Sequence, residues 1–393
     1  MKQLKVAFIT STFPSPDKPS LGVFNLRAAK ALNEYCDLTV YKLRMWIPGR
    51  KIKSEIVYEG IKVKNYAIPM LPPFGIFFTI FDCYISSFFL RNEIRSNQYN
   101  LLFSSGINYA GLLCSMISPY AKVKHVAQVI GSDINLYLPK LLKLNIRKNY
   151  YEGTHGIISV CIDLKNKANE MLPKITNTKV VYRGIDIEKF KLVNRKRQDD
   201  KTQFLYLGGF PKGKGDVGRN LKGGINLITL WKKNENIFKD SNFKILIGGV
   251  YSNNKWLVEW RNSLLFPENV ELVGNLKPEK AKEMIIESDI ILLPSLNEGL
   301  PNLAVESAAL GRVVLGSNVN GVPEIIKDKV TGIILPANDL NAWKEAMINY
   351  GKDKKHLEIL GENAREWVCK NFDSKHFAPQ VIQFFEETIL LNQ

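Results

Sequence analysis

Two glutamates with seven residues between them, Glu298 and Glu306, are the side chains in this sequence that best suit chemistry on a sugar. Each carboxylate can accept hydrogen bonds from a pair of neighbouring hydroxyls, so each could bind one sugar ring. One ring could be a ribose and the other a sugar that is transferred. Taken alone, each glutamate is explained equally well as an acid that complements the positive end of a helix.

The segment around the glutamates is suited to bind a diphosphate. We expect a strand to end at Ser295, and Pro301 stands where a first helical turn would start, a favoured position for proline. The helix would continue to about Leu310 and end at Gly311. The first turn of such a helix offers free N–H groups and a positive dipole end, and Gly299 lets a ligand approach the backbone.

The elements that must position this segment alternate between short apolar strands and helices. In the second half, five expected strands end in glycine, proline or serine, as in a parallel sheet whose carboxyl edge binds a ligand. They are 204–207, 243–247, 270–273, 290–293 and 313–315. In the first half, the expected strands are 6–9, 38–41, 63–66, 100–104, 124–129 and 156–160, with helices over 22–34 and 73–90. This alternation predicts an α/β fold with parallel sheets covered on both faces.

Chain length and one polar segment predict two domains. The chain of 393 residues is long for one core, and residues 191–202 are charged and poor in large apolar side chains. We expect an N-terminal domain over 1–190, a linker over 191–202 and a second domain over 203–372. Residues 373–393 have apolar side chains at helical spacing, and we expect this helix to cross back to the first domain.

The surroundings of the two glutamates resemble a known enzyme family. Pro294 to Glu306 reads P-S-x-x-E-G-L-P-N-x-x-x-E, which is similar to the E-x7-E signature of family-four retaining glycosyltransferases, or glycosyl transferases group 1. That family has the GT-B fold, in which two Rossmann-like domains with parallel sheets face each other across a cleft. Further resemblances, spread over nearly the whole chain, lie at 20–24, 131–133, 184–190, 207–209, 222–223, 274–276, 288–295, 321–326 and 331–332.

The resemblance assigns roles to the residues that match. Glu306 would bind ribose hydroxyls, and Glu298 would bind the hydroxyls of the donor sugar. Lys222 would neutralise the diphosphate as negative charge develops on it. Gly22 would let the loop backbone of the first domain contact the same phosphates, and Asp133 would act in catalysis on acceptor or sugar hydroxyls. The other donor-binding residues would be Gly209, Arg219, Gly274, Leu276, Gly299, Leu300, Asn302 and Leu303.

The resemblance also implies a reaction with no metal and no other cofactor. No D-x-D metal motif stands near the glutamates, so lysine, arginine and the helix dipole would replace the cation. It implies a hexosyltransferase that retains the anomeric configuration, with attack on the same face as the leaving phosphate because no enzymatic nucleophile is visible. The donor would be a nucleotide-sugar, and the acceptor a glycan or lipid-linked molecule in the synthesis of cell-envelope polysaccharide, lipopolysaccharide or exopolysaccharide.

The loop after residue 209 departs from the pattern of the family. Phe210 stands where a basic residue usually follows the strand. Arg219, or else Lys212 or Lys214, would supply the missing charge. The loop is equally well explained as a flexible basic insertion.

Two further departures leave other functions open. Ile130 replaces the histidine expected before Gly131, and Arg183 replaces an asparagine before Gly184. Arg183 is either a phosphate or acceptor contact or a surface arginine. The alternatives are a non-catalytic sugar-nucleotide-binding or scaffold protein of GT-B fold, and a GT-B nucleotide-sugar epimerase. A P-loop NTPase is disfavoured, because Gly215 stands where a serine or threonine would hold magnesium.

Composition bears on partners and on location. The formal net charge is +16, without an arginine-rich tail, which favours phosphate ligands or an anionic membrane over nucleic acid. The charge is equally well explained by solubility alone. The five cysteines are widely spaced, which suits a reducing compartment, and the apolar run 6–10 is too short for a signal peptide. The apolar stretch 73–90 contains Asp82, so we expect a helix packed under the sheet. The alternative is membrane contact with Arg91 to Arg95 on lipid headgroups, in a cytoplasmic protein peripheral to the inner face of the membrane.

Overall fold

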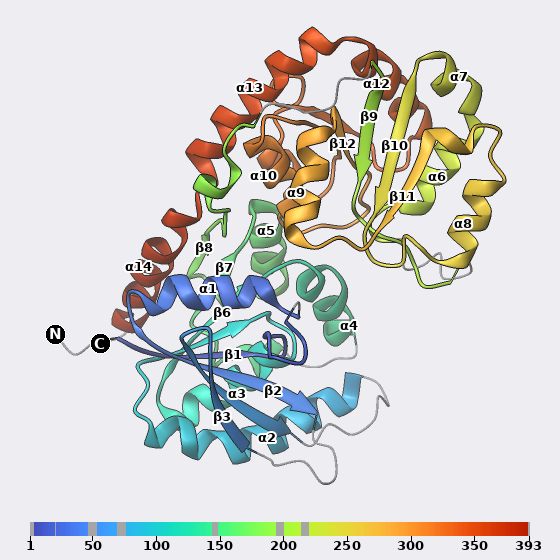
Figure 1. Ribbon diagram of the computed structural model, residues 1–393. Coiled ribbons are helices and arrows are strands. Elements are labelled where there is room, and N and C mark those ends of the chain that lie inside the picture. Colours follow the sequence, from blue (N-terminus) through green and yellow to red (C-terminus); the bar gives the residue numbers. More distant parts are fainter. Residues whose placement is uncertain are drawn as a thin grey trace. The chain divides into compact units, whose positions relative to one another are not determined.

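The computed structural model describes residues 4–19, 21–45, 53–68, 76–143, 148–193, 200–213 and 220–391, and these form two compact units (Figure 1). Unit 1 comprises Met1–Arg183 and Ser374–Gln393, and unit 2 comprises Gly184–Asp373. The chain therefore passes into unit 2 at residue 184, ahead of the segment 191–202 that we expected as the linker. The C-terminal segment belongs to the first unit.

Unit 1 contains an eight-stranded sheet in the order β3-β4-β2-β1-β5-β6-β7-β8. The strands are β1 (Lys5–Thr10), β2 (Asp37–Met45), β3 (Lys53–Tyr58), β4 (Ile61–Ile68), β5 (Leu101–Ser105), β6 (Lys124–Val129), β7 (Gly156–Ser159) and β8 (Thr178–Val180). The sequence did not indicate β3 or β8, and β3 runs antiparallel to β4 whereas the other neighbours are parallel. Glu59 and Gly60 both have positive φ (46° and 83°), as a two-residue hairpin turn requires.

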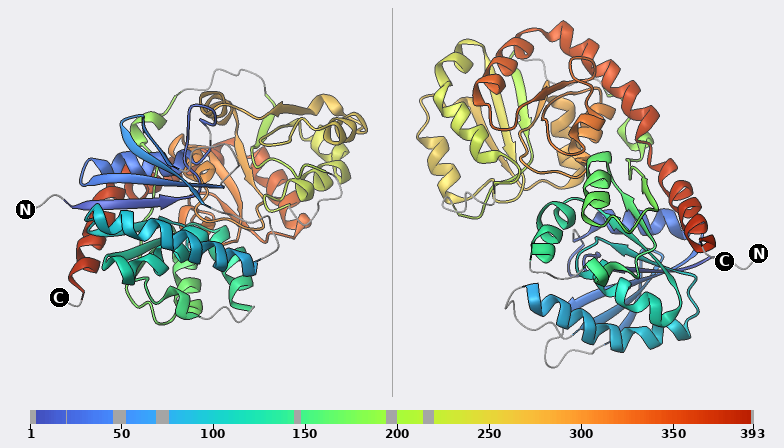
Figure 2. Two further views of the ribbon diagram at one scale, coloured as in Figure 1. Left: turned by 90° about the horizontal axis from the view of Figure 1, so that it is seen from below. Right: turned by 180° about the vertical axis from the view of Figure 1, so that it is seen from behind.

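Helices cover this sheet and include the last helix of the chain. They are α1 (Val23–Asn33), α2 (Ile76–Ser96), α3 (Tyr109–Ala121), α4 (Leu138–Lys143), α5 (Ile162–Met171) and α14 (Phe377–Leu390). Helix α14, red in Figure 2, contacts α1 and β6. Its Phe385 ring lies 5.1 Å from that of Phe103, centroid to centroid, and both side chains are fully buried. Residues from the two ends of the chain thus share one core.

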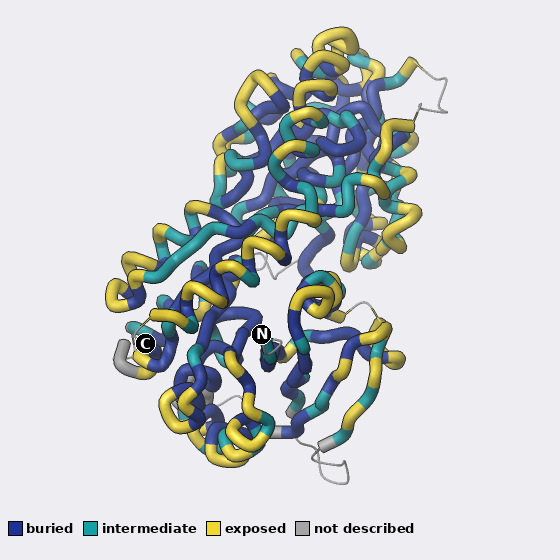
Figure 3. Tube along the Cα trace, turned by 90° about the vertical axis from the view of Figure 1, so that its left-hand side faces the viewer, coloured by how far each residue is buried: buried dark blue, intermediate teal, exposed yellow. Residues whose placement is uncertain are grey.

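Unit 2 contains a six-stranded, wholly parallel sheet in the order β11-β10-β9-β12-β13-β14. The strands are β9 (Thr202–Tyr206), β10 (Phe243–Gly248), β11 (Val270–Gly274), β12 (Ile290–Leu293), β13 (Val313–Ser317) and β14 (Ile333–Leu335). The helices are α6 (Gly224–Lys233), α7 (Glu235–Asp240), α8 (Lys255–Asn262), α9 (Pro278–Glu287), α10 (Asn302–Ala309), α11 (Val322–Ile325), α12 (Leu340–Lys352) and α13 (Lys354–Asn371). Figure 3 shows that the strands are largely buried. Their aromatic core includes Phe204, Trp231, Phe243 and Trp343.

The expectation of two α/β domains with mainly parallel sheets is confirmed. All eleven strands expected from the sequence are present within a few residues of their expected bounds. Helix α2 occupies most of the apolar stretch 73–90, of which residues 73–75 lie outside the described residues. Among the helices that the structure describes, none combines the length and the apolar character needed to cross a bilayer.

The shared core predicts that the last helix stabilises unit 1. Phe385→Ala should lower the free energy of unfolding of unit 1 by about 3–5 kcal/mol, because it leaves a cavity against Phe103. Leu390→Ala, at a side chain that is 64% exposed, is the matched control and should change it by less than about 0.5 kcal/mol. Hydrogen exchange of unit 1 peptides in increasing urea measures both values. Equal effects of the two variants would contradict this account of the core.

Candidate active site

The loops that follow β9 and β10 approach each other through glycine. Gly209 and Gly249 have φ of 74° and 103°, and a Cβ on Gly249 would lie 2.5 Å from the Gly209 nitrogen. The buried Tyr206 hydroxyl donates to the Gly209 carbonyl (2.7 Å) and contacts the Lys222 carbonyl at 3.2 Å. Tyr206 therefore ties the two ends of the loop between β9 and α6 to the end of its own strand.

The same loop lies directly against the loop that follows β12. A Cβ on Gly223, whose φ is 71°, would lie 1.8 Å from the Pro294 carbonyl oxygen, so no other residue fits there without movement. The backbone N–H of Leu296 donates to the Leu221 carbonyl at 2.8 Å. Residues that are more than 70 positions apart in sequence are thus held side by side by backbone contacts alone.

This contact brings together the two residues expected to carry the chemistry. The Lys222 Nζ lies 2.7 Å from Glu298 Oε2, and the Ser295 hydroxyl donates to Glu298 Oε1 at 2.7 Å. The Glu298 side chain is 7% exposed and that of Lys222 is 46% exposed. Asn320 Oδ1 accepts the Glu298 backbone N–H at 2.9 Å. Two side chains therefore hold the carboxylate and a third holds the Glu298 backbone, while the ammonium group remains accessible to an anion.

Helix α10 begins beside this pair. Pro301, expected in the first turn, is instead the extended residue just before it (ψ 112°), and the helix starts at Asn302. No side chain caps this end, so the first N–H groups of the helix retain their capacity to bind an anion. Glu306 is partly buried in the second turn, as expected.

The other expected donor-binding residues of unit 2 lie at or next to the carboxyl ends of its strands. Gly274 ends β11 with φ 73° and open space around it, and its carbonyl accepts the Gly249 N–H at 2.9 Å. Gly299, Leu300 and Leu303 are partly exposed around the start of α10, as is Leu276 after β11, and Asn302 is exposed. Arg219 and Lys214 lie outside the described residues, so their expected role stays a prediction.

Phe210 is a core residue. It is buried, and its ring lies 5.6 Å from that of Tyr206 and 5.7 Å from that of Trp256. A basic side chain here would bury a charge between aromatic rings, which explains why the position is apolar. Any cation that this loop contributes must come from another position.

In unit 1, Gly22 lies at the start of α1, after β1. Its φ is 73°, and a Cβ would lie 2.5 Å from the Thr12 carbonyl oxygen. Asn25 fixes the loop by donating to the Thr10 hydroxyl (2.9 Å) and to the Thr12 carbonyl (2.7 Å). No side chain caps α1 either. Gly22 itself is buried after the carboxyl end of β1, and its expected contact with phosphate stays a prediction.

Asp133 in unit 1 holds backbone rather than facing solvent. It is 1% exposed and accepts the N–H groups of Ile107 (3.1 Å), Ile130 (3.1 Å) and Gly131 (2.8 Å). Burial raises the pKa of this carboxyl, and the backbone N–H groups oppose the shift. Its expected catalytic role stays a prediction, and in this structure it joins the loops after β5 and β6.

Three supporting residues were not among the expected site residues. They are Tyr206, Ser295 and Asn320, which hold Gly209, Lys222 and Glu298 in place. Only the role of Ser295 could have been inferred from the sequence, because it stands three positions before Glu298 in the segment P-S-x-x-E. The other two lie far from the glutamates in sequence, so their roles depend on the fold.

Comparison with known proteins shows which proteins this chain is similar to. Residues 190–367, nearly all of unit 2, match the family model described as glycosyl transferases group 1. An uncharacterized glycosyltransferase of Methanocaldococcus jannaschii is 26% identical over 342 residues, which cover 85% of this chain and 87% of that protein. Unit 2 therefore carries a group 1 glycosyltransferase domain. A putative teichuronic acid biosynthesis glycosyltransferase of Bacillus subtilis is 21% identical to this glycosyltransferase and covers 94% of it, with 95% of its own length matched.

Solved structures show that the glycosyltransferase has the GT-B fold. Sucrose-phosphate synthase from Thermosynechococcus elongatus has a TM-score of 0.75 at 16% identity, covering 99% of this chain and 100% of that chain. Anabaena HepE, solved in complex with UDP-glucose, has a TM-score of 0.66 at 14% identity, covering 98% and 100% of the two chains. At such identities the likeness concerns the fold alone.

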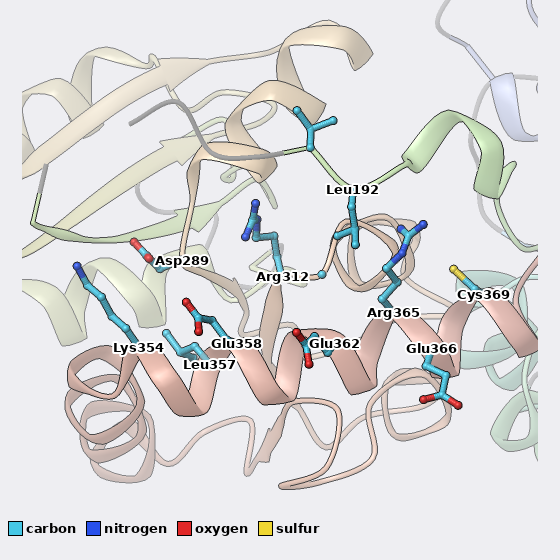
Figure 4. A pocket seen from close by; sticks show the side chains of 12 residues that line it. Leu192, Asp289, Arg312, Lys354, Leu357, Glu358, Glu362, Arg365, Glu366 and Cys369 are labelled. Atoms are coloured by element: carbon cyan, nitrogen blue, oxygen red, sulfur yellow. The ribbon is translucent and has the colours of Figure 1, made fainter. Parts of the chain in front are cut away.

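A pocket of about 850 Å³ in unit 2 of the glycosyltransferase lies at the opposite edge of the sheet (Figure 4). Its lining includes Asp289 and Arg312, which immediately precede β12 and β13, and side chains of α13. Asp289 accepts the Gln203 backbone N–H at 2.7 Å, and Arg365 donates to the carbonyls of Phe190 and Ala309. These polar groups hold backbone, and the hollow is remote from the carboxyl edge that carries Lys222 and Glu298.

No three histidine, cysteine, aspartate or glutamate side chains come together as a metal-binding group in the described part of the glycosyltransferase. A reaction that needs no metal stays a prediction. The chemistry that the described residues offer is electrostatic: one accessible ammonium group, one fixed carboxylate and an uncapped helix start.

The ion pair predicts coupling between its two members. In a double-mutant cycle, Lys222→Met and Glu298→Gln should show an interaction of about 1–2 kcal/mol in the free energy of unfolding of unit 2, because the carboxylate is buried. The pair Lys244–Glu271, at 2.8 Å with side chains 26% and 52% exposed, is the matched control. Its cycle, Lys244→Met with Glu271→Gln, should give less than about 1 kcal/mol. Urea unfolding, monitored by hydrogen exchange of unit 2 peptides, gives the four free energies of unfolding of each cycle. A coupling no larger than that of the control pair would contradict the inference that burial strengthens the Lys222–Glu298 pair.

Proposed function

We propose that the protein is a retaining hexosyltransferase that moves a sugar from a nucleotide-sugar to a glycan or lipid-linked acceptor. The observation that carries the proposal is the Lys222–Glu298 pair beside the uncapped start of α10. A diphosphate needs a cation and N–H donors, and a sugar ring needs a fixed carboxylate. All three features lie at the carboxyl edge of one parallel sheet, where ligands bind in such folds.

In this proposal, binding of the donor breaks the ion pair between Lys222 and Glu298 and replaces it with contacts to the donor. The diphosphate competes with Glu298 for the Lys222 ammonium group, and Glu298 Oε2 is then available to accept sugar hydroxyls. Ser295 keeps Oε1 in place throughout, because its hydroxyl bond does not involve the lysine. Lys222 then opposes the charge that grows on the leaving diphosphate, in a site that is already organised for it. Glu306 binds the ribose hydroxyls, and Arg219 supplies a second cation.

The relatives support the choice of substrates. HepE was solved with UDP-glucose, which supports a nucleotide-sugar donor that carries a hexose. The Bacillus subtilis relative is named for teichuronic acid biosynthesis, which supports a role in cell-envelope or exopolysaccharide synthesis. Retention through attack on the same face as the leaving phosphate follows from the family resemblance. Asp133 would act on acceptor hydroxyls after a local rearrangement of the backbone that it now holds.

Turnover should depend on the pair. Thermal shift against UDP-, GDP- and ADP-sugars identifies the donor, because a ligand of the native state raises the melting temperature. With that donor, Glu298→Gln and Lys222→Ala should each lower kcat by about 10²–10³-fold. Glu271→Gln and Lys244→Ala are the matched controls and should leave kcat unchanged. Release of nucleoside diphosphate measures all four rates.

Two results would overturn this function. Unchanged rates in both Glu298→Gln and Lys222→Ala would remove the pair from catalysis. Tight donor binding with no turnover for any acceptor, and no slow hydrolysis, would favour the non-catalytic sugar-nucleotide-binding alternative, which the replacement of the expected histidine by Ile130 also suggests.

We further propose that the protein works as a peripheral protein on the anionic inner face of the cell membrane, through helix α2. Several large aromatic side chains of this helix are exposed, and its buried side chains include polar groups. Asp82 and Ser86 are 5% and 0% exposed. The exposed fractions of Phe81, Tyr84, Phe88 and Phe89 are 48%, 69%, 55% and 58%. A surface helix in water usually exposes polar side chains, so this aromatic face fits an apolar environment.

Basic residues at the end of α2 fit anionic headgroups beside such an environment. The Arg91 guanidinium lies 4.4 Å from the Phe88 ring centroid and 4.0 Å from that of Tyr120, and Arg95 is exposed. Arginines next to exposed aromatic rings are typical of helices that lie in the plane of a membrane interface. A lipid-linked acceptor would reach the protein along this surface.

Vesicle binding tests the membrane proposal. The double variant Phe88→Gln and Phe89→Gln should reduce binding to phosphatidylglycerol-containing vesicles by about tenfold or more, because two partly inserted rings are lost. Ile359→Gln combined with Leu390→Gln, at side chains 53% and 64% exposed, is the control and should bind like the wild type. The proposal would be overturned if the wild-type protein failed to sediment with the vesicles. It would also be overturned if the protein formed a dimer that the Phe88→Gln and Phe89→Gln variant dissociated.

A further inference from the structure

A row of polar side chains follows the carboxyl edge of the unit 1 sheet on the face that α1 covers. Phe8, Phe103 and Val126 belong to the core on that face. Side chains alternate along a strand, so the residues two positions further, Thr10, Ser105 and Gln128, lie on the same face. The row continues beyond β8 with Arg183, which hydrogen-bonds to Gln128.

One half of the row is internally satisfied. Asn25 of α1 donates to Thr10 and accepts from the Ser105 hydroxyl, both at 2.9 Å. These three side chains therefore have a structural role in holding the first turn of α1 against β1 and β5. Their donors are used in these mutual bonds, so this half of the row offers no evidence of a ligand.

The other half of the row has donors without acceptors. Gln128 is fully buried, and its Oε1 accepts from Arg183 Nη2, but its Nε2 has no hydrogen-bond partner among the described residues. The buried Nε of Arg183 likewise has none in the described structure. Buried donors without partners are rare and costly, which points to a ligand that completes them.

The positive charge of Arg183 has no ion-pair partner among the described residues. Its guanidinium lies 4.9 Å from the Phe24 ring centroid, and burial lowers its pKa to about 10. The carboxylate of Asp133 opposes this lowering of the pKa, but its oxygens already accept backbone N–H groups. A partly buried cation beside an already occupied carboxylate favours the arrival of a further anion.

The start of α1 packs next to Arg183. This helix of 11 residues begins at Val23 without a side-chain cap, and Phe24 in its first turn is the residue whose ring contacts Arg183. The Arg183 guanidinium therefore lies against a side chain of the first turn of α1. Arg183 is partly exposed, so an anion from solvent can reach it.

We propose that Arg183, Gln128 and the first turn of α1 form an oxyanion-binding site for a carboxylate or phosphate group of a substrate. The planar guanidinium and the amide Nε2 supply side-chain donors, and the helix start supplies backbone donors and a positive dipole end. The oxyanion is either an acid group of the acceptor or a phosphate of the donor. Its assignment to a substrate rests on the proposed transfer function, whereas the anion site itself does not.

Binding measurements on the full chain test the site without any turnover. Inorganic phosphate, glucuronate and UDP are titrated against the wild type and the variants by thermal shift. Arg183→Gln should weaken phosphate and glucuronate binding by about 10–100-fold, and Arg183→Lys by less, because one charge remains but the planar donors are lost. Lys179→Gln, in strand β8 of the same sheet, is the matched control and should bind both anions like the wild type.

A second variant keeps the test decisive should Arg183→Gln fail to fold. Gln128→Glu has nearly the same shape and can still accept from Arg183, but its negative charge should abolish anion binding while the protein stays folded. Loss of glucuronate binding with unchanged UDP binding assigns the site to the acceptor, and parallel loss of UDP binding assigns it to the donor. Both results support the site.

Two results would contradict the anion site. Wild-type protein that shows no saturable binding of phosphate or glucuronate overturns the site, as do folded Arg183 and Gln128 variants that bind both anions like the wild type. Glu298→Gln separates this test from that of the proposed function, because it should lose turnover and keep anion binding at Arg183.

Discussion

The close approach of two backbones at Gly223 and Pro294 is the constraint on which the candidate active site depends. Lys222 and Glu298 are 76 positions apart in sequence, and their side chains meet because a residue without a Cβ lets one loop lie on the other. The hydrogen bond from Leu296 to the Leu221 carbonyl fixes the register of that contact. Charge attraction then acts between groups that the backbone has already brought together, so little conformational entropy remains to oppose it.

In unit 1, too, a glycine allows close backbone approach and buried polar side chains fix the loops. Gly22 lets the start of α1 lie against the Thr12 backbone. Asn25 donates to the Thr12 carbonyl and bonds to the Thr10 and Ser105 hydroxyls, and Asp133 accepts backbone N–H groups. Buried polar side chains of this kind fix loops that would otherwise be mobile, because each unsatisfied backbone group would cost free energy. Arg183 and Gln128 differ from them in having donors that the chain itself does not satisfy.

Two features that appear anomalous in the sequence have ordinary causes in the fold. Phe210 occupies an expected cationic position because it completes an aromatic cluster with Tyr206 and Trp256. Helix α2 was ambiguous as a sequence because its apolar residues surround the whole helix. The structure separates them: Cys83, Leu90 and Ile94 are buried against unit 1, while the large aromatic side chains remain exposed.

The sequence by itself determined the fold class, most strands and the pairing of Glu298 with a helix start, because strand periodicity, glycine positions and the family motif are local signals. It could not determine β3, which depends on a turn at Glu59 and Gly60, nor the supporting roles of Tyr206 and Asn320. Tertiary structure alone decided that Lys222 bonds to Glu298, that Asp133 is committed to backbone, and that Arg183 lies by Phe24. These contacts join residues distant in sequence, and their geometry follows from sheet order and backbone approach, which no local pattern encodes.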